Sequence, residues 1–502
     1  MSAAREQPVL DVAAIGAGFG GLCLAIKLKD QGIGSFAIFD RGADFGGTWR
    51  DNTYPGAACD VPSAMYSYSF YPGKWTSAFP RQSEILRYLH RAADHFGARD
   101  HFHFDAEVTA ARFDTDAALW RLELVDGRQI AARVLVSAVG QLHRPVIPQL
   151  PGVDSFTGPA FHSAQWRHEV DLRGKKVAVV GTGASAIQLV PEVAKEAAHL
   201  TVFQRSAPYV IGKNVKRYSD WQRNVIHHVA PVRLANRLRF FMIGEAAASA
   251  FTGANPLVRQ VLLSRWRLRL HRGVRDPELR EKLKPDYELG CKRMLLSNEW
   301  YPAMARENVE VVTSGVTEVT ASGLTAGDGT HREVDVIIYG TGFAAPSFLQ
   351  PMRVEGLDGQ TLDDAWRDGA QAHLGVCVHG FPNFFLIYGP NTNLGSNSII
   401  YMIETQVAWI TQALRGLERS GGRWLDVRAD RQADFVAWVD RATQRGAYSG
   451  GCHSWYTAAG RNTNNWPTLT PLYRRRLRRF DLLDFDVEPA SEVPAVTRIG
   501  RR

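Results

Sequence analysis

Two glycine-rich turns carry the clearest chemistry in this chain of 502 residues. The first is Gly16-x-Gly18-x-x-Gly21, and it lies between an apolar strand and a helix. Asp40 ends the next strand, about twenty residues later, where an acid accepts the two hydroxyls of an adenosine ribose. The pattern predicts a dinucleotide site. We expect it to be formed by Gly16, Gly18, Phe19, Gly21 and Asp40.

The second turn is Gly181-x-Gly183, followed by a helix and the strand "LTVFQR". This strand ends in Arg205 rather than in an acid. A cation at that point favours a ribose that carries a 2′-phosphate and therefore predicts NADPH rather than NADH. The alternative is a surface arginine that happens to follow a strand. The residues expected at this site are Gly181, Thr182, Gly183, Ser185, Gln188, Arg205 and Ser206.

The order of the two turns predicts how the chain is organised. An acid after the first and an arginine after the second favour FAD first and NADPH second. The buried strands in "ARVLVSAVGQLHRP" and "VDVIIYGTGF" would return the chain to each sheet. We expect an α/β fold with two discontinuous Rossmann-like domains and a helical insertion. The FAD domain would span residues 1–144 and 381–502, the NADPH domain residues 151–212 and 289–380, and the insertion residues 213–288.

The predicted insertion shows helical spacing and many arginines. We expect it to cover the active site. A basic amphipathic role at a membrane surface is the alternative.

Composition narrows the function classes. A hydrophobic content of 45% and a charged content of 22% are those of a soluble globular protein, and the net charge of +8 suits anionic ligands or simply solubility. The five cysteines show no C-x-x-C or metal-ligand spacing, which argues against a metal site, a disulfide scaffold or a dithiol redox centre. No signal peptide or membrane-spanning run is present, so we expect a cytoplasmic protein without nucleic-acid partners or stable membrane insertion.

A third pattern, F-x-G-x-x-x-H-x-x-x-W, is matched by Phe156, Gly158, His162 and Trp166. With it the chain resembles the class B flavoprotein monooxygenases, and within them the Baeyer-Villiger monooxygenases that use FAD and NADPH. Relatives that oxygenate nitrogen usually carry Phe or Tyr in the last position, so Trp166 favours the Baeyer-Villiger branch. In this family the residue after the tryptophan is usually Pro or Asp, and here it is Arg167.

The resemblance assigns further residues. In "GGTWRDNTYPGAACD" it implies Thr48 and Trp49 against the flavin and Asp60 in the active site. In "YELGCKRMLLSNEWYPAM" it implies an active-site Arg293, with Lys292 beside Arg205 at the 2′-phosphate. It also implies cofactor contacts from Tyr66, Val108, Asn391 and, at the nicotinamide, Trp455.

The implied reaction converts a ketone to an ester or lactone with NADPH and O₂, through a covalent peroxide on the flavin. A guanidinium stays charged, so Arg293 could stabilise the peroxide and the adduct oxyanion, with Asp60 orienting it. His162 could shuttle a proton, but we favour a structural role in which the Phe-Gly-His-Trp stretch is a hinge. Aryl, linear, cyclic and steroid ketones all fit the sequence.

Two other functions stay open at this point. A flavin-containing monooxygenase would oxygenate sulfur or nitrogen instead of a ketone. A non-catalytic FAD and NADPH sensor would consume no NADPH when a ketone is added. A disulfide reductase is not favoured, because it would need a C-x-x-C beside the flavin.

Overall fold

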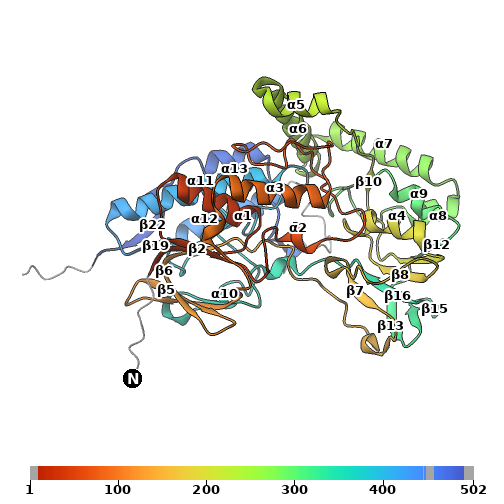
Figure 1. Cartoon of the computed structure of the whole chain (residues 1–502), viewed down its shortest axis with the longest axis horizontal. Helices are drawn as coiled ribbons and strands as arrows, with labels where there is room; N and C mark the ends of the chain where they lie inside the picture. Colours follow the sequence, from red (N-terminus) through yellow and green to blue (C-terminus); the bar gives the residue numbers. More distant parts are fainter. Residues whose placement is uncertain (1–8, 445, 448–456, 459, 491–502) are drawn as a thin grey trace, which may run out of the picture.

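The computed structural model describes residues 9–444, 446–447, 457–458 and 460–490. Two sheets, each covered by helices, lie side by side (Figure 1). The first turn belongs to one sheet and the second turn to the other. The predicted pair of dinucleotide folds is therefore present.

The first sheet has eight strands, with spatial order β17-β4-β5-β6-β1-β2-β3 and β18 paired to β6. Their bounds are β1 Leu10–Ile15, β2 Phe36–Phe39, β3 Phe102–His103, β4 Val108–Asp114, β5 Leu119–Leu124, β6 Gln129–Ser137, β17 Arg353–Glu355 and β18 Phe384–Leu386. β1 runs parallel to both β2 and β6, and Ile15 lies opposite Phe39 and Ser137. The carboxyl ends of these three strands therefore meet at one edge, which is where ligands bind in open α/β sheets.

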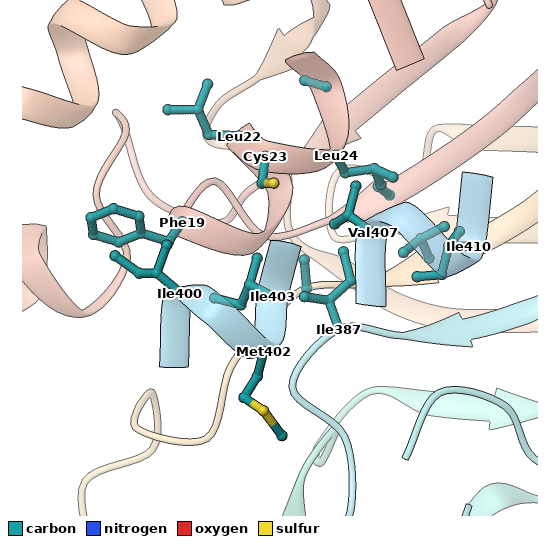
Figure 2. Close-up of a cluster of buried hydrophobic side chains, with 14 of the residues drawn as sticks. Phe19, Leu22, Cys23, Leu24, Ile387, Ile400, Met402, Ile403, Val407 and Ile410 are labelled. Atoms are coloured by element: carbon teal, nitrogen blue, oxygen red, sulfur yellow. The ribbon is translucent and has the colours of Figure 1, made fainter. Parts of the chain in front are cut away.

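Helix α1 (Phe19–Asp30) follows the first turn and is buried on nearly every face. It lies against α11 (Ile399–Ser420), which belongs to the other end of the chain. Figure 2 shows Phe19 and Cys23 of α1 close to Ile400 and Ile403 of α11. The first domain is thus closed by two distant segments that share one apolar core.

The second sheet is fully parallel, with spatial order β12-β9-β8-β16-β7. Its strands are β7 Ala160–His162, β8 Lys176–Val180, β9 His199–Phe203, β12 Val309–Val312 and β16 Val336–Tyr339. Helix α4 (Ala186–Glu196) follows the second turn. The Phe-Gly-His-Trp stretch supplies the edge strand β7, in which His162 pairs with Tyr339. It is thus part of this sheet rather than a free linker.

The predicted helical insertion is present, and Figure 1 shows α5, α6 and α7 along the upper margin of the molecule. Its helices are α5 Asp220–His228, α6 Ala230–Phe251, α7 Pro256–Gly273 and α8 Pro277–Lys282. β10 Val210–Ile211 pairs with β11 Leu295–Leu296 where the insertion leaves and rejoins the second domain. Among the described residues, no helix is both long and apolar enough to cross a bilayer.

The remaining elements pack around these layers. The helices are α2 Thr48–Asp51, α3 Gln82–His95, α9 Trp300–Met304, α10 Leu362–Ala365, α12 Ala429–Thr443 and α13 Thr470–Arg476. The strands form three small antiparallel units: β13 Val316–Thr320 with β14 Gly323–Ala326 and β15 His331–Glu333, β19 Trp424–Val427 with β22 Phe485–Glu488, and β20 Thr457–Ala458 with β21 Arg461–Asn462.

The chain returns to the first domain earlier than the boundary predicted at residue 381. β17 pairs in parallel with β4 of the first sheet. Phe348, Leu349 and Val354 are buried in the same apolar cluster as Trp120. Residues from about 348 onward therefore belong with the first sheet, because their apolar side chains find their partners there.

The cysteines differ in state. Cys23, Cys59 and Cys377 are buried free thiols, and burial raises the pKa of each. Cys291 is disulfide-bonded. The spacing of the cysteines does not predict this bond, which lies next to Lys292 and Arg293.

Candidate active site

The first turn is shaped for close approach of a ligand. Gly16 has φ +113°, and a Cβ on it would lie 2.4 Å from the carbonyl oxygen of Ala138. A Cβ on Gly21 would lie 1.9 Å from the carbonyl oxygen of Gly16. Around Gly18, in contrast, the nearest such contact is Gly47 at 4.0 Å. Gly16 and Gly21 are thus required by backbone packing, and Gly18 leaves open the space that a pyrophosphate needs.

Asp40 is buried at the end of β2. Its Oδ2 accepts a hydrogen bond from the backbone N–H of Ala17 at 2.7 Å, and its Oδ1 accepts one from Gly42 at 2.7 Å. Arg50 pairs with the same carboxylate at 2.8 Å. These bonds hold the carboxylate at the turn, as a ribose-binding acid requires. Sequence reasoning missed Arg50, although it follows Trp49 directly.

One cavity of about 560 Å³ brings residues of both dinucleotide folds together. Its lining includes the predicted residues Gly16, Gly18, Phe19, Asp40, Thr48, Trp49, Asp60, Tyr66, Val108, Ser185, Gln188 and Arg293. Its lining contains no residue of α5–α8, but Glu245 of α6 accepts a hydrogen bond at 2.6 Å from Asn397, which lines the cavity. That the insertion covers the site stays a prediction. A cavity shared in this way lets one cofactor meet the other.

The segment from Gly46 to Asp60 crosses from the first domain to the second. Gln188 of α4 accepts hydrogen bonds from the Tyr54 hydroxyl at 3.0 Å and the Ala58 N–H at 3.2 Å, and donates to the Ala58 carbonyl at 3.0 Å. A Cβ on Gly56 would lie 2.6 Å from the Gln188 carbonyl oxygen. Gln188, which we expected to contact a cofactor, therefore joins the two domains at the cavity wall.

Asp60 and Arg293 meet at the cavity. The Nη2 atom of Arg293 donates to Oδ1 of Asp60 at 2.8 Å, and both side chains stay partly exposed, at 27% and 20% respectively. Lys213 lies close enough for its charge to interact with Asp60; burial lowers the pKa of Lys213, and Asp60 opposes that shift. No signal in the sequence marked Lys213, because it stands alone in a stretch without a motif. The structure thus places two cations near one carboxylate.

A polar cluster forms where β9 ends. Lys292 donates to the Ser206 hydroxyl at 2.6 Å, and the Thr182 hydroxyl donates to the Ser206 carbonyl at 2.9 Å. Burial lowers the pKa of Lys292, and the neighbouring charge of Arg205 lowers it further. Two neighbouring cations that repel each other are stabilised by a dianion between them. Gly181 fits the turn beside them, because a Cβ there would lie 2.4 Å from the carbonyl oxygen of Gly340.

The aromatic residues expected at the flavin pack together. Trp49 donates through Nε1 to the Tyr66 hydroxyl at 2.8 Å, and the two rings meet edge to face at 5.6 Å. Burial raises the pKa of Tyr66 well above its usual value, which keeps the phenol protonated. Asn391 does not line the cavity, because its amide donates to the Asn462 carbonyl at 2.6 Å; Asn393 lines it instead. Trp455 lies outside the described residues.

His162 is fully buried in β7. Its Nδ1 accepts a hydrogen bond from the Ala164 N–H at 3.1 Å, and its ring meets Phe343 edge to face at 5.5 Å. Burial lowers the pKa of His162 to about 4. The ring is therefore neutral near pH 7, which favours the structural role over the proton shuttle.

The fold and the cavity define a protein that holds two dinucleotides at one shared site. Residues 10–244 match the FMO-like family, described as flavin-binding monooxygenase-like. The chain is 44% identical to a Baeyer-Villiger monooxygenase of Streptomyces coelicolor, over 98% of this chain and 94% of that protein. It is 42% identical to a Baeyer-Villiger monooxygenase of Pseudomonas aeruginosa, over 94% of this chain and 90% of that protein.

Solved structures agree with these relatives. The chain resembles an oxidised steroid monooxygenase bound to NADP, with a TM-score of 0.86, 29% identity, and coverage of 96% of this chain and 100% of that one. OTEMO in complex with FAD and NADP gives a TM-score of 0.85, 28% identity and the same coverage. The chain therefore belongs to the Baeyer-Villiger monooxygenases. The predicted family, with its FAD and NADPH cofactors, is confirmed.

Proposed function

We propose that this chain oxidises a small ketone to an ester or lactone with NADPH and O₂, and that Arg293, held by Asp60, is its catalytic cation. The observation that carries the proposal is the Arg293–Asp60 pair at 2.8 Å in the wall of the shared cavity. FAD fits the first fold, because Gly18 leaves space at the turn and Asp40 is fixed at the end of β2. NADPH fits the second, because Arg205, Ser206 and Lys292 gather beyond β9.

FAD, once reduced by NADPH, supplies the oxygen activation. The chain supplies charge and orientation. Attack on a ketone carbonyl builds negative charge on oxygen, and a guanidinium already fixed in the cavity wall stabilises that charge with little reorganisation. Asp60 accepts a hydrogen bond from Arg293 and so fixes the direction of its guanidinium in the cavity wall.

The same arrangement favours ketones over thioethers. A nucleophilic attack generates an oxyanion and gains from a permanent cation, whereas oxygen transfer to sulfur builds no such anion. Sulfur oxygenation is therefore the second candidate function, and Arg293 should matter less to it.

The decisive experiment gives the FAD-loaded enzyme NADPH, ¹⁸O₂ and equimolar aryl ketone and thioether, with products followed by mass spectrometry. We expect an ester that carries one labelled oxygen. Arg293→Ala should lower ester formation by about 10²–10³-fold, the usual loss for one charge-stabilising donor. Flavin reduction by NADPH, measured anaerobically by stopped flow, should change much less. The rate of ester formation in Asp60→Ala should lie between the rates of the wild type and of Arg293→Ala.

The matched control is Arg332→Ala, which breaks an ion pair of 2.9 Å with Glu310 in the second domain, outside the cavity lining. It should leave the ratio of ester to sulfoxide unchanged. Sulfoxide as the sole product, or equal loss of ester and sulfoxide in Arg293→Ala, would overturn the role proposed for Arg293.

A further inference from the structure

The helical insertion exposes a row of large apolar side chains. On α6, Leu234, Leu238 and Met242 are 62%, 60% and 58% exposed. They are spaced four residues apart, so they share one side of the helix. On α7, Leu257, Val261 and Leu268 are 77%, 51% and 50% exposed. We call these six side chains the outer apolar face. Exposed apolar side chains gathered on two neighbouring helices in this way indicate an interaction site.

The other sides of both helices are already packed. Arg237 of α6 donates to the carbonyl oxygens of Ala64 and Ser67, each at 3.1 Å. On α7, Trp266 and Leu270 are buried in the core of the second domain. The inner sides of α6 and α7 therefore hold the helices in place, and the fold does not need contacts from the outer apolar face.

The charge around this face is predominantly positive. Between Trp221 and Arg275 the sequence has ten arginines and a single acid, Glu245. Glu245 is buried, where it accepts hydrogen bonds from the Asn397 amide and the Thr470 backbone N–H. Asp220 at the start of α5 is exposed and pairs with Arg223, and Glu288 pairs with Arg259 of α7. The exposed charge of α5–α7 is therefore strongly positive in total.

Several of these cations are exposed among the apolar residues. Arg239 on α6 and Arg265 and Arg272 on α7 are exposed, and within the described chain they form no ion pair. Trp221, at the start of α5, is 72% exposed. A composition of exposed arginine, leucine and tryptophan is typical of helices that lie at a lipid interface.

We propose that α5–α7 dock this enzyme on an anionic lipid bilayer surface. The apolar side chains would enter the boundary between headgroups and acyl chains, and the arginines would bind the anionic headgroups. A second copy of the chain is a poorer occupant, because two such faces would bring like charges together. The proposal is independent of ketone oxidation, since no residue of α5–α8 lines the cavity.

The test is co-sedimentation of the FAD-loaded enzyme with vesicles of phosphatidylcholine alone or with one third phosphatidylglycerol. We expect binding to the anionic vesicles, little binding to neutral ones, and weakening as salt is raised. The triple variant Leu234→Ser, Leu238→Ser, Met242→Ser should lose binding. The pair Arg239→Gln, Arg265→Gln should weaken it roughly 25-fold, at about fivefold for each basic residue near an anionic surface.

Matched controls lie outside the insertion. Val125 and Leu483 are 64% and 73% exposed, and Arg112 and Arg133 are exposed on strands of the first sheet. Val125→Ser with Leu483→Ser, and Arg112→Gln with Arg133→Gln, should leave vesicle binding unchanged. Unchanged ketone oxidation in detergent-free buffer would show that the insertion variants are folded.

Three results would overturn the proposal. The first is no binding to anionic vesicles. The second is binding that the triple serine variant retains in full. The third is a concentration-dependent dimer, seen by light scattering, that the same variant abolishes, because the face would then belong to a second copy.

Discussion

At the scale of single residues, the assignment of Lys292 to the 2′-phosphate of NADPH can be tested directly. It donates to Ser206 beside Arg205, and burial lowers its pKa. A 2′-phosphate between these cations would gain charge-assisted hydrogen bonds of about 1.5–3 kcal/mol each. We expect Lys292→Ala to raise KM for NADPH at least tenfold and to leave KM for NADH unchanged.

Steady-state kinetics with each nucleotide measures the effect. Lys195→Ala is the control, because Lys195 pairs with Glu192 on the exposed end of α4. Equal rises in KM for both nucleotides would remove Lys292 from the 2′-phosphate site.

His162 predicts a pH dependence of stability. In the folded chain its pKa is about 4, below the ordinary value of 6.5, because the ring is buried. The unfolded chain takes up the proton first as the pH falls. The resulting stability is complete above pH 6.5 and is lost as the pH falls toward 4, by about 3 kcal/mol at most.

The variant His162→Gln should remove this component. His143 shifts in the same direction, so the comparison of wild type with the variant isolates His162. Urea unfolding between pH 4 and pH 7 gives both curves. If the two curves run parallel, the buried ring does not carry this dependence.

At the scale of elements, the packing of the segment that leads into β7 requires a glycine at position 158. A Cβ on Gly158 would lie 2.4 Å from the Asp335 carbonyl oxygen and 2.8 Å from the Phe156 ring. Gly158→Ala should therefore lower the free energy of unfolding by about 1–3 kcal/mol, the usual cost of overpacking. Gly315→Ala in the same domain is the control, because a Cβ there meets nothing within 4 Å. Equal unfolding midpoints in the two variants would mean that position 158, just before β7, has room for a side chain.

The elements also show which parts of the fold can be predicted from the sequence. Both glycine turns and their flanking strands and helices were predictable, because the glycine positions and apolar runs are local signals. β17 was not predictable, because this strand has only three residues and its position depends on pairing with β4. The same holds for side chains. The Lys292-Arg293 pair has a motif, whereas Lys213 joins Asp60 only through tertiary packing.

At the scale of the whole molecule, Gln188 couples the two domains. Its side chain makes hydrogen bonds to Tyr54 and Ala58 across the interface. Gln188→Leu should slow flavin reduction by NADPH about 10- to 100-fold, because a small misplacement of one cofactor relative to the other is enough. FAD binding should change little.

Anaerobic stopped flow at saturating NADPH measures this rate. Gln432→Leu is the control, since Gln432 accepts a hydrogen bond from the His379 N–H within the first domain. Unchanged reduction in Gln188→Leu would mean that other contacts set the distance between the domains.

The pairing of β18 with β6 also has a consequence for synthesis of the protein. β6 ends at Ser137, and β18, which lies directly beside it, begins at Phe384. A ribosome that adds 5–20 residues per second needs roughly 12–50 s to cover that interval. During that time the edge of β6 that later binds β18 is unpaired, and the second domain has all its strands before the first is complete. A chain truncated after residue 345 and released from the ribosome should therefore resist protease in the second domain while the first is still cleaved. We therefore expect the chain to assemble from its middle outward, with a chaperone binding at the unpaired edge of β6 at that stage.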